Sequence, residues 1–232
     1  MKQIPLAIGP EPLPTFDNFV PGANGAALQH LQALTLPAAP VYLWGPAGSG
    51  KTHLLRALAS DCRAAGLVVA GFDAADMTPW TLPAGAALAV IDRCEALDAP
   101  AQHAAFGLFV DAAAQGLQLV AAGRLPPVDL PLRDDLRTRL GWGHIFALEP
   151  LAEAETRAVL RREADRRGIF LSDELMDHLL TRFERDLSHL MGLLDRLDHY
   201  ALASGRQVTV PLLRRMLVEE GAETPAAAVA GR

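Results

Sequence analysis

The sequence predicts an α/β domain with a central parallel sheet, followed by a small all-α domain. Short apolar runs of the kind that form buried strands alternate with helical patterns as far as about residue 150. The first of these runs, residues 41–44, leads directly into a glycine-rich turn and then into a helical pattern rich in leucine and alanine. From residue 151 onward the helical patterns continue without strands. The 232 residues are therefore expected to form two domains of different character.

The elements of the first domain follow in order along the chain. A short helix is expected over residues 24–34, where Leu28, Leu31 and Leu34 recur at helical spacing. The expected strands cover residues 41–44, 67–72, 86–92 and 118–123. Two longer helices are expected over residues 51–65 and 101–114, where glycines at 66 and 116 suit their ends, and a short one over residues 132–140. A parallel sheet with this alternation binds its ligand at the carboxyl ends of the strands.

The glycine-rich turn after the first strand has the pattern of a phosphate-binding loop. It consists of Gly45, Pro46, Ala47, Gly48, Ser49, Gly50, Lys51 and Thr52. The glycines allow backbone N–H groups to converge on the β-phosphate of a nucleotide, and the following helix presents its positive N-terminal end to the same anion. Lys51 is expected to reach the β- and γ-phosphate oxygens, and Thr52 to place its hydroxyl on Mg²⁺. The cofactors predicted are thus ADP or ATP with Mg²⁺; the alternative is a glycine-rich turn with a chance lysine.

The apolar run over residues 86–92 ends in Asp92. Such a run is typical of a central parallel strand whose carboxyl end faces a magnesium nucleotide, so Asp92 is expected to hold the metal through water. The alternative is that Asp92 caps a following helix. Many ring-type ATPases carry a second acid at the next position to orient the attacking water, but here that residue is Arg93. Glu95 either compensates or is a surface charge at a helix start, and weak hydrolysis by this chain alone is expected.

Composition excludes several other classes of function. The formal charge of −6 argues against a general affinity for nucleic-acid backbone. Cys62 and Cys94 share no metal-ligand spacing with each other or with the seven histidines, which favours buried thiols in a reducing compartment. No apolar run reaches the roughly 18 residues that span a bilayer, and no signal-peptide pattern is present, so a cytoplasmic location without a membrane partner is expected. Arginine pairs at 161–162 and 166–167 either contact nucleic acid or form a solvated helix face.

The two ends of the chain and the second domain complete the organisation. Residues 1–15 contain four prolines among apolar side chains, which predicts an extended segment that packs on the domain itself or in a partner's groove. Residues 151–218 are expected to form a helical lid, with helices over 152–167, 172–183, 186–203 and 211–218. Residues 219–232 are alanine-rich without apolar periodicity, so disorder is expected there.

The order of these motifs resembles the DnaA-related AAA+ family of bacterial replication proteins. The resemblance rests on residues 16–22, the phosphate-binding loop, the strand ending at Asp92, residues 124–127, the run 136–143 and the helical lid. Its most specific parts are the loop and residues 139–143. It covers roughly residues 3–218 and implies an AAA+ P-loop base domain over 16–150 with a helical lid over 151–218. The initiator continues past its lid into a helix-turn-helix DNA-binding domain, for which this chain leaves no room. The resemblance is therefore closer to the regulatory inactivators of the initiator, and direct sequence-specific DNA binding is not expected.

The resemblance also implies partners and the residues that meet them. Arg139 would be an arginine finger, which reaches the γ-phosphate held by a neighbouring subunit and stabilises charge in the transition state. The segment containing Gln3, Ile4, Leu6 and Ile8 is similar to the six-residue motif that binds the β sliding clamp of DNA polymerase III. Gln3 would hydrogen-bond at the rim of the clamp pocket while Leu6 and Ile8 fill its apolar part. The implied partners are DnaA, the clamp and, as an open question, a second copy of the chain.

Three positions depart from the family's nucleotide-sensing pattern. Arg93 replaces the acid or amide beside Asp92, Gly123 stands where a sensing aspartate is usual, and Ser188 occupies the place of a lid arginine. The departures favour a chain that holds a nucleotide, preferably ADP, as a structural ligand and acts on the nucleotide of its partner. The expected function is negative regulation of replication initiation by a clamp-bound adaptor that stimulates ATP hydrolysis by DnaA. The alternatives are a self-sufficient AAA+ ATPase such as a helicase loader, and a P-loop phosphotransferase.

Overall fold

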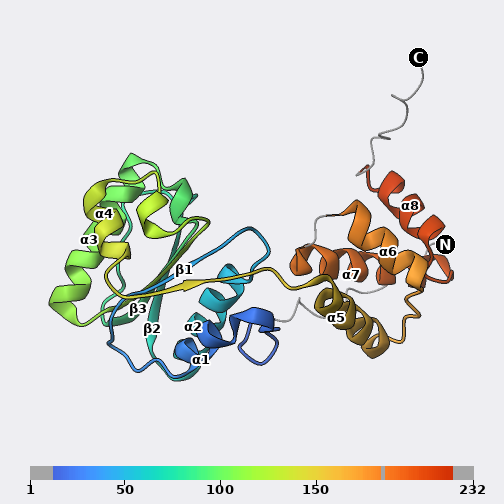
Figure 1. Ribbon diagram of the computed structural model, residues 1–232, viewed down its shortest axis with the longest axis horizontal. Coiled ribbons are helices and arrows are strands. Elements are labelled where there is room, and N and C mark those ends of the chain that lie inside the picture. Colours follow the sequence, from blue (N-terminus) through green and yellow to red (C-terminus); the bar gives the residue numbers. More distant parts are fainter. Residues whose placement is uncertain (1–12, 184–185, 222–232) are drawn as a thin grey trace, which may run out of the picture. The chain divides into compact units, whose positions relative to one another are not determined.

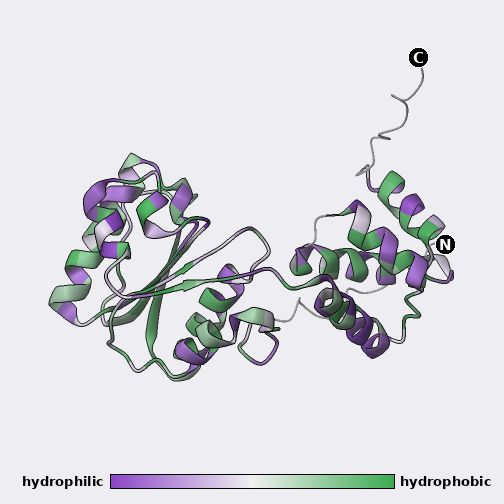
Figure 2. Ribbon diagram, in the orientation of Figure 1, coloured by the Kyte–Doolittle hydropathy of each residue, from purple (hydrophilic) through white to green (hydrophobic). Residues whose placement is uncertain are grey.

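The computed structural model describes residues 13–183 and 186–221, and the chain divides into two compact units (Figure 1). Residues 11–151 form the unit that contains the sheet, and the other unit contains the helices that follow residue 152. Each unit has its own apolar core. Figure 2 shows the apolar residues concentrated in the strands and along one face of the helices. Among the described residues, none of the helices is long and apolar enough to cross a membrane.

The central sheet contains five parallel strands in the order β2-β3-β4-β1-β5. They are β1 (Val41–Trp44), β2 (Val68–Asp73), β3 (Ala86–Asp92), β4 (Gln118–Gly123) and β5 (His144–Ala147). β4 is central and buried along its whole length. β1 and β4 are neighbours, yet the connection from β1 runs to β2 at one edge of the sheet and that from β4 runs to β5 at the other. In open α/β sheets, ligands bind outside the carboxyl ends of the strands at such a reversal.

Alternate side chains of the strands enter two separate apolar clusters, as the period of two in a strand requires. The helices of this unit are α1 (Gly25–Gln32), α2 (Lys51–Ala64), α3 (Ala99–Gln115) and α4 (Asp134–Leu140). On one face of the sheet, Leu43 and Val120 pack with residues of α1 and α2. On the other face, Tyr42 and Ala121 pack with residues of α3 and α4. The result is a three-layer α/β unit, which confirms the predicted fold class.

The strands expected from the sequence are confirmed, each within one residue of its expected ends. β5 is absent from the sequence prediction, although residues 145–148 are all apolar, because this run is short and follows directly after the helix expected over 132–140 and its glycines. In the structure three of its four side chains are exposed. It is also an edge strand that pairs only with β1. The helix expected from residue 132 begins at Asp134, since Arg133 keeps an extended ψ of 143°.

The two cysteines are buried and unpaired with each other, as the sequence predicts. Cys62 and Cys94 are both buried free thiols in the α/β unit. Burial raises the pKa of both thiols, since the thiolate loses hydration when it is taken out of water. Neither side chain is therefore suited to nucleophilic or redox chemistry.

The helical unit is built around a leucine-rich core. Its helices are α5 (Glu153–Arg166), α6 (Asp173–Arg182), α7 (Leu187–Ser204) and α8 (Val210–Glu219). The side chains of Ser172 and Thr209 accept hydrogen bonds from the backbone of the first turns of α6 and α8, which caps both helices. α8 includes Glu219, so the range expected to be disordered overlaps the helix by one residue; residues 222–232 lie outside the described part of the chain.

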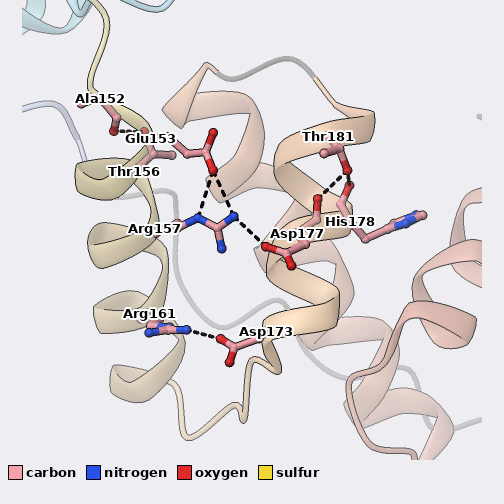
Figure 3. A network of polar contacts seen from close by, with 9 residues as sticks. All are labelled: Ala152, Glu153, Thr156, Arg157, Arg161, Asp173, Asp177, His178 and Thr181. Atoms are coloured by element: carbon pink, nitrogen blue, oxygen red, sulfur yellow. Dashed lines mark hydrogen bonds and ion pairs between the residues drawn. The ribbon is translucent and has the colours of Figure 1, made fainter.

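Ion pairs join α5 to α6 on the surface of this unit (Figure 3). The guanidinium of Arg157 donates to Glu153 on its own helix at 3.0 Å and to Asp177 on α6 at 2.6 Å. One turn later, Arg161 pairs with Asp173 at the start of α6. The two pairs hold α5 and α6 side by side at successive turns.

The remaining basic residues of α5 are also largely paired with acids. Arg166 and Arg167 both donate to Glu163, and Arg167 also donates to Asp195 on α7 at 2.8 Å. Three of the four arginines in the two basic pairs are thus partly neutralised. Of the two interpretations of these arginines, the structure favours a paired, solvated helix face, because phosphate binding needs unpaired positive charge.

Replacing Glu163 with Gln should lower the free energy of unfolding of the helical unit by about 1–2 kcal/mol at pH 7, after allowance for solvent screening. Arg166, together with Arg167, lowers the pKa of the Glu163 carboxyl from 4.5 to about 2. Because the folded-state pKa is the lower one, the stabilisation is complete above about pH 4.5 and is lost as the pH falls toward 2. Urea unfolding of both proteins at several pH values measures this. Glu174→Gln, an exposed acid on α6, is the matched control, and a difference that does not change with pH would contradict the prediction.

Candidate nucleotide-binding site

The turn between β1 and α2 has a backbone that only glycine supports at two positions. Gly45 has φ of 156° and Gly50 has φ of 92°. A Cβ on Gly45 would overlap the carbonyl oxygen of Leu148, and a Cβ on Gly50 would lie 2.6 Å from Cε2 of Phe19. The loop is therefore packed between Leu148, which follows β5, and an aromatic ring, and these contacts restrict its shape.

The segment that precedes α1 supports the loop from outside, a feature that sequence reasoning missed. The Phe19 ring lies against Gly50 and has its centroid 5.4 Å from the ring of His53 on α2. His53 Nε2 lies 2.9 Å from the carbonyl oxygen of Thr15. Phe16 and Phe19 are both buried in the core beside the loop, which explains why aromatic residues stand in the run 16–22.

Lys51 begins α2 and folds its side chain back over the loop. Its ammonium donates to the carbonyl oxygens of Gly45 at 2.8 Å and Pro46 at 2.7 Å, and to the hydroxyl of Ser49 at 3.2 Å. The loop therefore holds a cation above the N-terminal end of a helix of 14 residues. A cation and a helix N-terminus in the same place suit the phosphates of a nucleotide.

Thr52 and Asp92 come together from α2 and the carboxyl end of β3. The Thr52 hydroxyl donates to Asp92 Oδ2 at 2.6 Å, and the backbone N–H of Arg93 donates to Asp92 Oδ1 at 2.9 Å. The residue that precedes the short 3₁₀ turn at Cys94–Ala96 is Arg93, so Asp92 does not cap it. Mg²⁺ prefers oxygen ligands, and a hydroxyl and a carboxylate both supply them, so these two residues fit the predicted metal.

Arg93 is turned away from Asp92 along the edge of the sheet. Its φ of 57° is a left-handed conformation that is uncommon for residues other than glycine. The guanidinium pairs with Asp73 at the end of β2, where Nε donates to Oδ2 at 2.8 Å. The residue next to Asp92 is thus a cation paired with the neighbouring strand β2. It cannot orient an attacking water molecule as a carboxylate at this position would.

The interpretation of Glu95 as a surface charge was wrong. Its side chain is 20% exposed, accepts from the backbone N–H of Arg124 at 3.0 Å, and lies 3.5 Å from the guanidinium Nε of the same residue. Glu95 therefore ties the 3₁₀ turn after β3 to the chain that leaves β4. Both of its oxygens are engaged in this contact.

The space beside Gly123 is filled by Tyr42, a residue that the sequence analysis does not single out. A Cβ on Gly123 would overlap the Tyr42 hydroxyl and lie 3.3 Å from Glu95 Oε2. The hydroxyl itself donates to the carbonyl oxygen of Leu125 at 3.0 Å, and burial raises the pKa of Tyr42 well above its usual value. A side chain that senses nucleotide at residue 123 has no room while this tyrosine is present.

Replacing Gly123 with Ala should destabilise the α/β unit by about 1–3 kcal/mol, the usual effect of overpacking a core. The cause is steric, since Gly123 is not among the residues with positive φ. In the Tyr42→Phe background the same substitution should cost less by about 1 kcal/mol, because the hydroxyl that the new methyl group meets is gone. Urea unfolding of the four proteins of this double-mutant cycle gives the coupling. Additive changes in the free energy of unfolding would mean that the Tyr42 hydroxyl does not exclude a side chain at residue 123.

Arg139 lies in the last turn of α4, and its described side-chain contacts are with aromatic rings. Its guanidinium carbon is 4.2 Å from the centroid of the Trp142 ring and 5.9 Å from that of Phe106. The other two arginines of this segment are engaged with acids: Arg133 pairs with Asp135, and Arg137 pairs with Asp134. Within the described residues, Arg139 has no such ion pair, which distinguishes it from its neighbours on the helix.

The remaining predicted residues lie where their contacts cannot be described. Gln3, Ile4, Leu6 and Ile8 lie outside the described residues, so clamp binding stays a prediction. Ser188 belongs to the first turn of α7, but its side chain is likewise outside the described part. The structure thus brings together the loop, Thr52 and Asp92, whereas Arg139 is on a separate helix of the same unit.

A phosphate-binding loop between β1 and α2 of a parallel sheet with this order, accompanied by a separate helical unit, defines an AAA+ P-loop protein. Residues 11–66 match the family model described as the bacterial DnaA ATPase domain, and residues 153–217 match the model described as the lid domain of Hda. The chain is an Hda-like, DnaA-related AAA+ protein.

Solved structures of DnaA and of RuvB share this fold. Domain III of DnaA from Thermotoga maritima is 22% identical, with a TM-score of 0.70 over 90% of this chain and 98% of that one. AMPPCP-bound DnaA from Aquifex aeolicus is 21% identical, with a TM-score of 0.68 over 91% of this chain and 70% of that one. RuvB from Thermotoga maritima is 18% identical, with a TM-score of 0.65 over 88% and 71% of the two chains. These similarities establish the fold.

Proposed function

We propose that this chain is a cytoplasmic negative regulator of DNA replication initiation, which stimulates hydrolysis of the ATP held by DnaA. The observation that carries the proposal is Arg139, a guanidinium on an AAA+ unit with no acidic partner among the described residues. A cation that is to act on the phosphates of another protein must keep its charge and its N–H donors available. The Hda-type lid supports the same function, because it relates the chain to the DnaA group.

The chain's own loop would hold an adenine nucleotide, ADP or ATP, as a structural ligand. Lys51 and the first N–H groups of α2 would bind the phosphates, and Thr52 with Asp92 would hold Mg²⁺, partly through water. When bound, Mg²⁺ supplies neutralisation of the phosphate charge. AMPPCP in the solved DnaA of similar fold supports a nucleotide here.

Hydrolysis of this nucleotide would be slow. A water molecule that attacks the γ-phosphate needs an acid or amide to orient it, and the candidates near Asp92 are already committed. Arg93 is paired with Asp73, and Glu95 is engaged with Arg124. The proposed division is therefore that this chain keeps its own nucleotide and supplies Arg139 to the nucleotide of DnaA.

The γ-phosphate of DnaA-bound ATP would be the target of Arg139. In the transition state, negative charge is spread over the equatorial oxygens of the transferred phosphoryl group, and a guanidinium can donate two parallel N–H bonds to it. Arginine fingers of related enzymes raise the rate by about 10³ to 10⁵. DnaA converted to its ADP form would then be unable to start a second round of replication.

The β sliding clamp would place this activity on newly replicated DNA. We expect Gln3 to hydrogen-bond at the rim of the clamp pocket, and Ile4, Leu6 and Ile8 to supply the apolar contacts. A pull-down with immobilised clamp tests this: the double variant Gln3→Ala with Leu6→Ala should lose binding. Retention equal to that of the unmodified protein would remove the clamp from the proposal.

The decisive experiment follows the conversion of ATP bound to purified DnaA into ADP. This chain and clamp-loaded DNA are added together, and each is then left out. Acceleration that requires both additions is the expected result. Brisk ATP turnover by this chain alone, with no effect on DnaA, would instead indicate a self-sufficient ATPase such as a helicase loader. The mass of the chain alone and with clamp, measured by light scattering, would also report self-association.

A further inference from the structure

Trp142 is a large aromatic side chain that the α/β unit leaves 63% exposed. It lies two residues after the end of α4, and one face of its indole covers the Arg139 guanidinium, whose carbon is 4.2 Å from the ring centroid. A single exposed aromatic side chain needs no explanation of its own, so its significance depends on what the ring contacts. What it contacts among the described residues is the arginine on which the proposed function depends.

The backbone fixes the place of Trp142 at both ends of its turn. The N–H of Trp142 donates to the carbonyl oxygen of Arg139 at 3.2 Å, which closes the last turn of α4 around the arginine. On the other side, a Cβ on Gly143 would overlap the carbonyl oxygen of Pro40, and the N–H of His144 donates to that same oxygen at 2.9 Å. The turn is therefore held between α4 and the start of the β1–β5 pair.

The kind of contact matters for what Arg139 can still do. An ion pair with a carboxylate would occupy its N–H donors and cancel its charge, as happens at Arg133 and Arg137. An aromatic face attracts the guanidinium through the π system and leaves the donors at the edge of the guanidinium plane free. Stacking thus restricts the side chain without consuming the groups that would bind phosphate.

We propose that Trp142 is a positioning residue, whose indole face holds the Arg139 guanidinium in one orientation with its N–H donors free for the γ-phosphate of the partner's nucleotide. This inference rests on the proposed function. Phe106, on α3, lies on the guanidinium at a longer distance of 5.9 Å and assists in the same way. Without the indole, Arg139 would keep its charge but would have to be ordered anew in each encounter with the partner.

The first test compares Trp142→Leu with Trp142→Phe in single-turnover hydrolysis of DnaA-bound ATP, at increasing concentrations of this chain bound to the clamp. Trp142→Leu should lower the maximal rate about threefold to tenfold, the effect of immobilising one flexible side chain, without changing the half-saturating concentration. Trp142→Phe should keep most of the rate, because an aromatic face remains. Phe170→Leu, which removes an aromatic side chain that is 84% exposed on the helical unit, is the matched control and should change nothing.

A second test observes the stack without DnaA. The side-chain protons of Arg139 should show ring-current shifts in the NMR spectrum of the full chain, and these shifts should vanish in Trp142→Leu and persist in Trp142→Phe. Arg139→Lys identifies the signals. Absence of the shifts in the unmodified protein would overturn the inference directly, whatever the activity of the variants.

The outcomes separate this inference from the proposed function. If Arg139→Ala leaves the stimulation intact, the proposed function fails. If Arg139→Ala removes the stimulation but Trp142→Leu has no effect on the maximal rate, only the positioning role fails. A raised half-saturating concentration with an unchanged maximal rate would make Trp142 a docking contact and would also overturn the inference.

Discussion

Replacing Arg139 with Ala should remove nearly all stimulation of ATP hydrolysis by DnaA, a loss of up to about 10³-fold or more. The guanidinium is the group proposed to meet the charge that develops on the γ-phosphate, and a methyl group offers neither charge nor a donor. Because Arg139 is only partly buried in the last turn of α4 and has no ion pair among the described residues, its removal should leave the fold intact. Single-turnover conversion of DnaA-bound ATP, with clamp-loaded DNA present, measures the effect.

Arg137→Ala is the matched control for this experiment. Arg137 lies on the same helix two residues earlier, is paired with Asp134, and donates to the carbonyl oxygen of Val128 at 3.3 Å. Its loss should leave the stimulation within about twofold, since surface ion pairs contribute little. Equal losses in the two variants would show that the integrity of α4, and not the guanidinium of Arg139, limits the activity.

Replacing Lys51 with Ala should weaken nucleotide binding by about 10- to 100-fold, the effect expected when a charge-assisted hydrogen bond is lost. The ammonium is held over the loop by the carbonyl oxygens of Gly45 and Pro46, so it is positioned at the mouth of the site. Titration with a fluorescent ADP analogue in the presence of Mg²⁺ gives the dissociation constants. We expect the unmodified protein to retain nucleotide through gel filtration and the variant to lose it.

Arg56→Ala separates the role of Lys51 from a general loss of positive charge. Arg56 is exposed on the same helix, about one turn further on, and should have no effect on nucleotide affinity. Normal retention of nucleotide by Lys51→Ala would contradict the assignment of this turn as a phosphate-binding loop. It would leave the proposed action of Arg139 on DnaA to be judged by its own experiment.

Most of the helices and strands could be predicted from the sequence, because buried parallel strands appear as apolar runs and amphipathic helices as apolar residues at helical spacing. Residues 86–92 and 118–123 are visible as apolar runs since helices cover both faces of the sheet. β5 has an apolar run as well, over residues 145–148, but four residues are too few to separate an edge strand from a loop without the structure. The loop residues could be assigned from spacing alone, since a phosphate-binding turn needs glycine and lysine at fixed positions along the chain.

Several contacts at the candidate site could not be predicted from the sequence, for a different reason. Glu95 binds Arg124, and Tyr42 fills the space at Gly123, because neighbouring strands and turns bring together residues far apart in the sequence. Spacing along one segment contains no information on such pairs. The stacking of Trp142 on Arg139 is local, but a tryptophan at this position looks like a core residue until its exposure is known.

The close approach of Gly143 to Pro40 has a consequence for anyone who would transplant this activity. Pro40 directly precedes β1, which leads to the nucleotide loop, and Gly143 directly precedes β5, which pairs with β1 in register from Val41 and His144. The turn bearing Trp142 and the strand feeding the loop therefore share one fixed point in the backbone. A graft of α4 and its turn onto another scaffold would therefore have to include Pro40 and Gly143. Without them the turn would not place Trp142 against Arg139, and the arginine would lose its orientation.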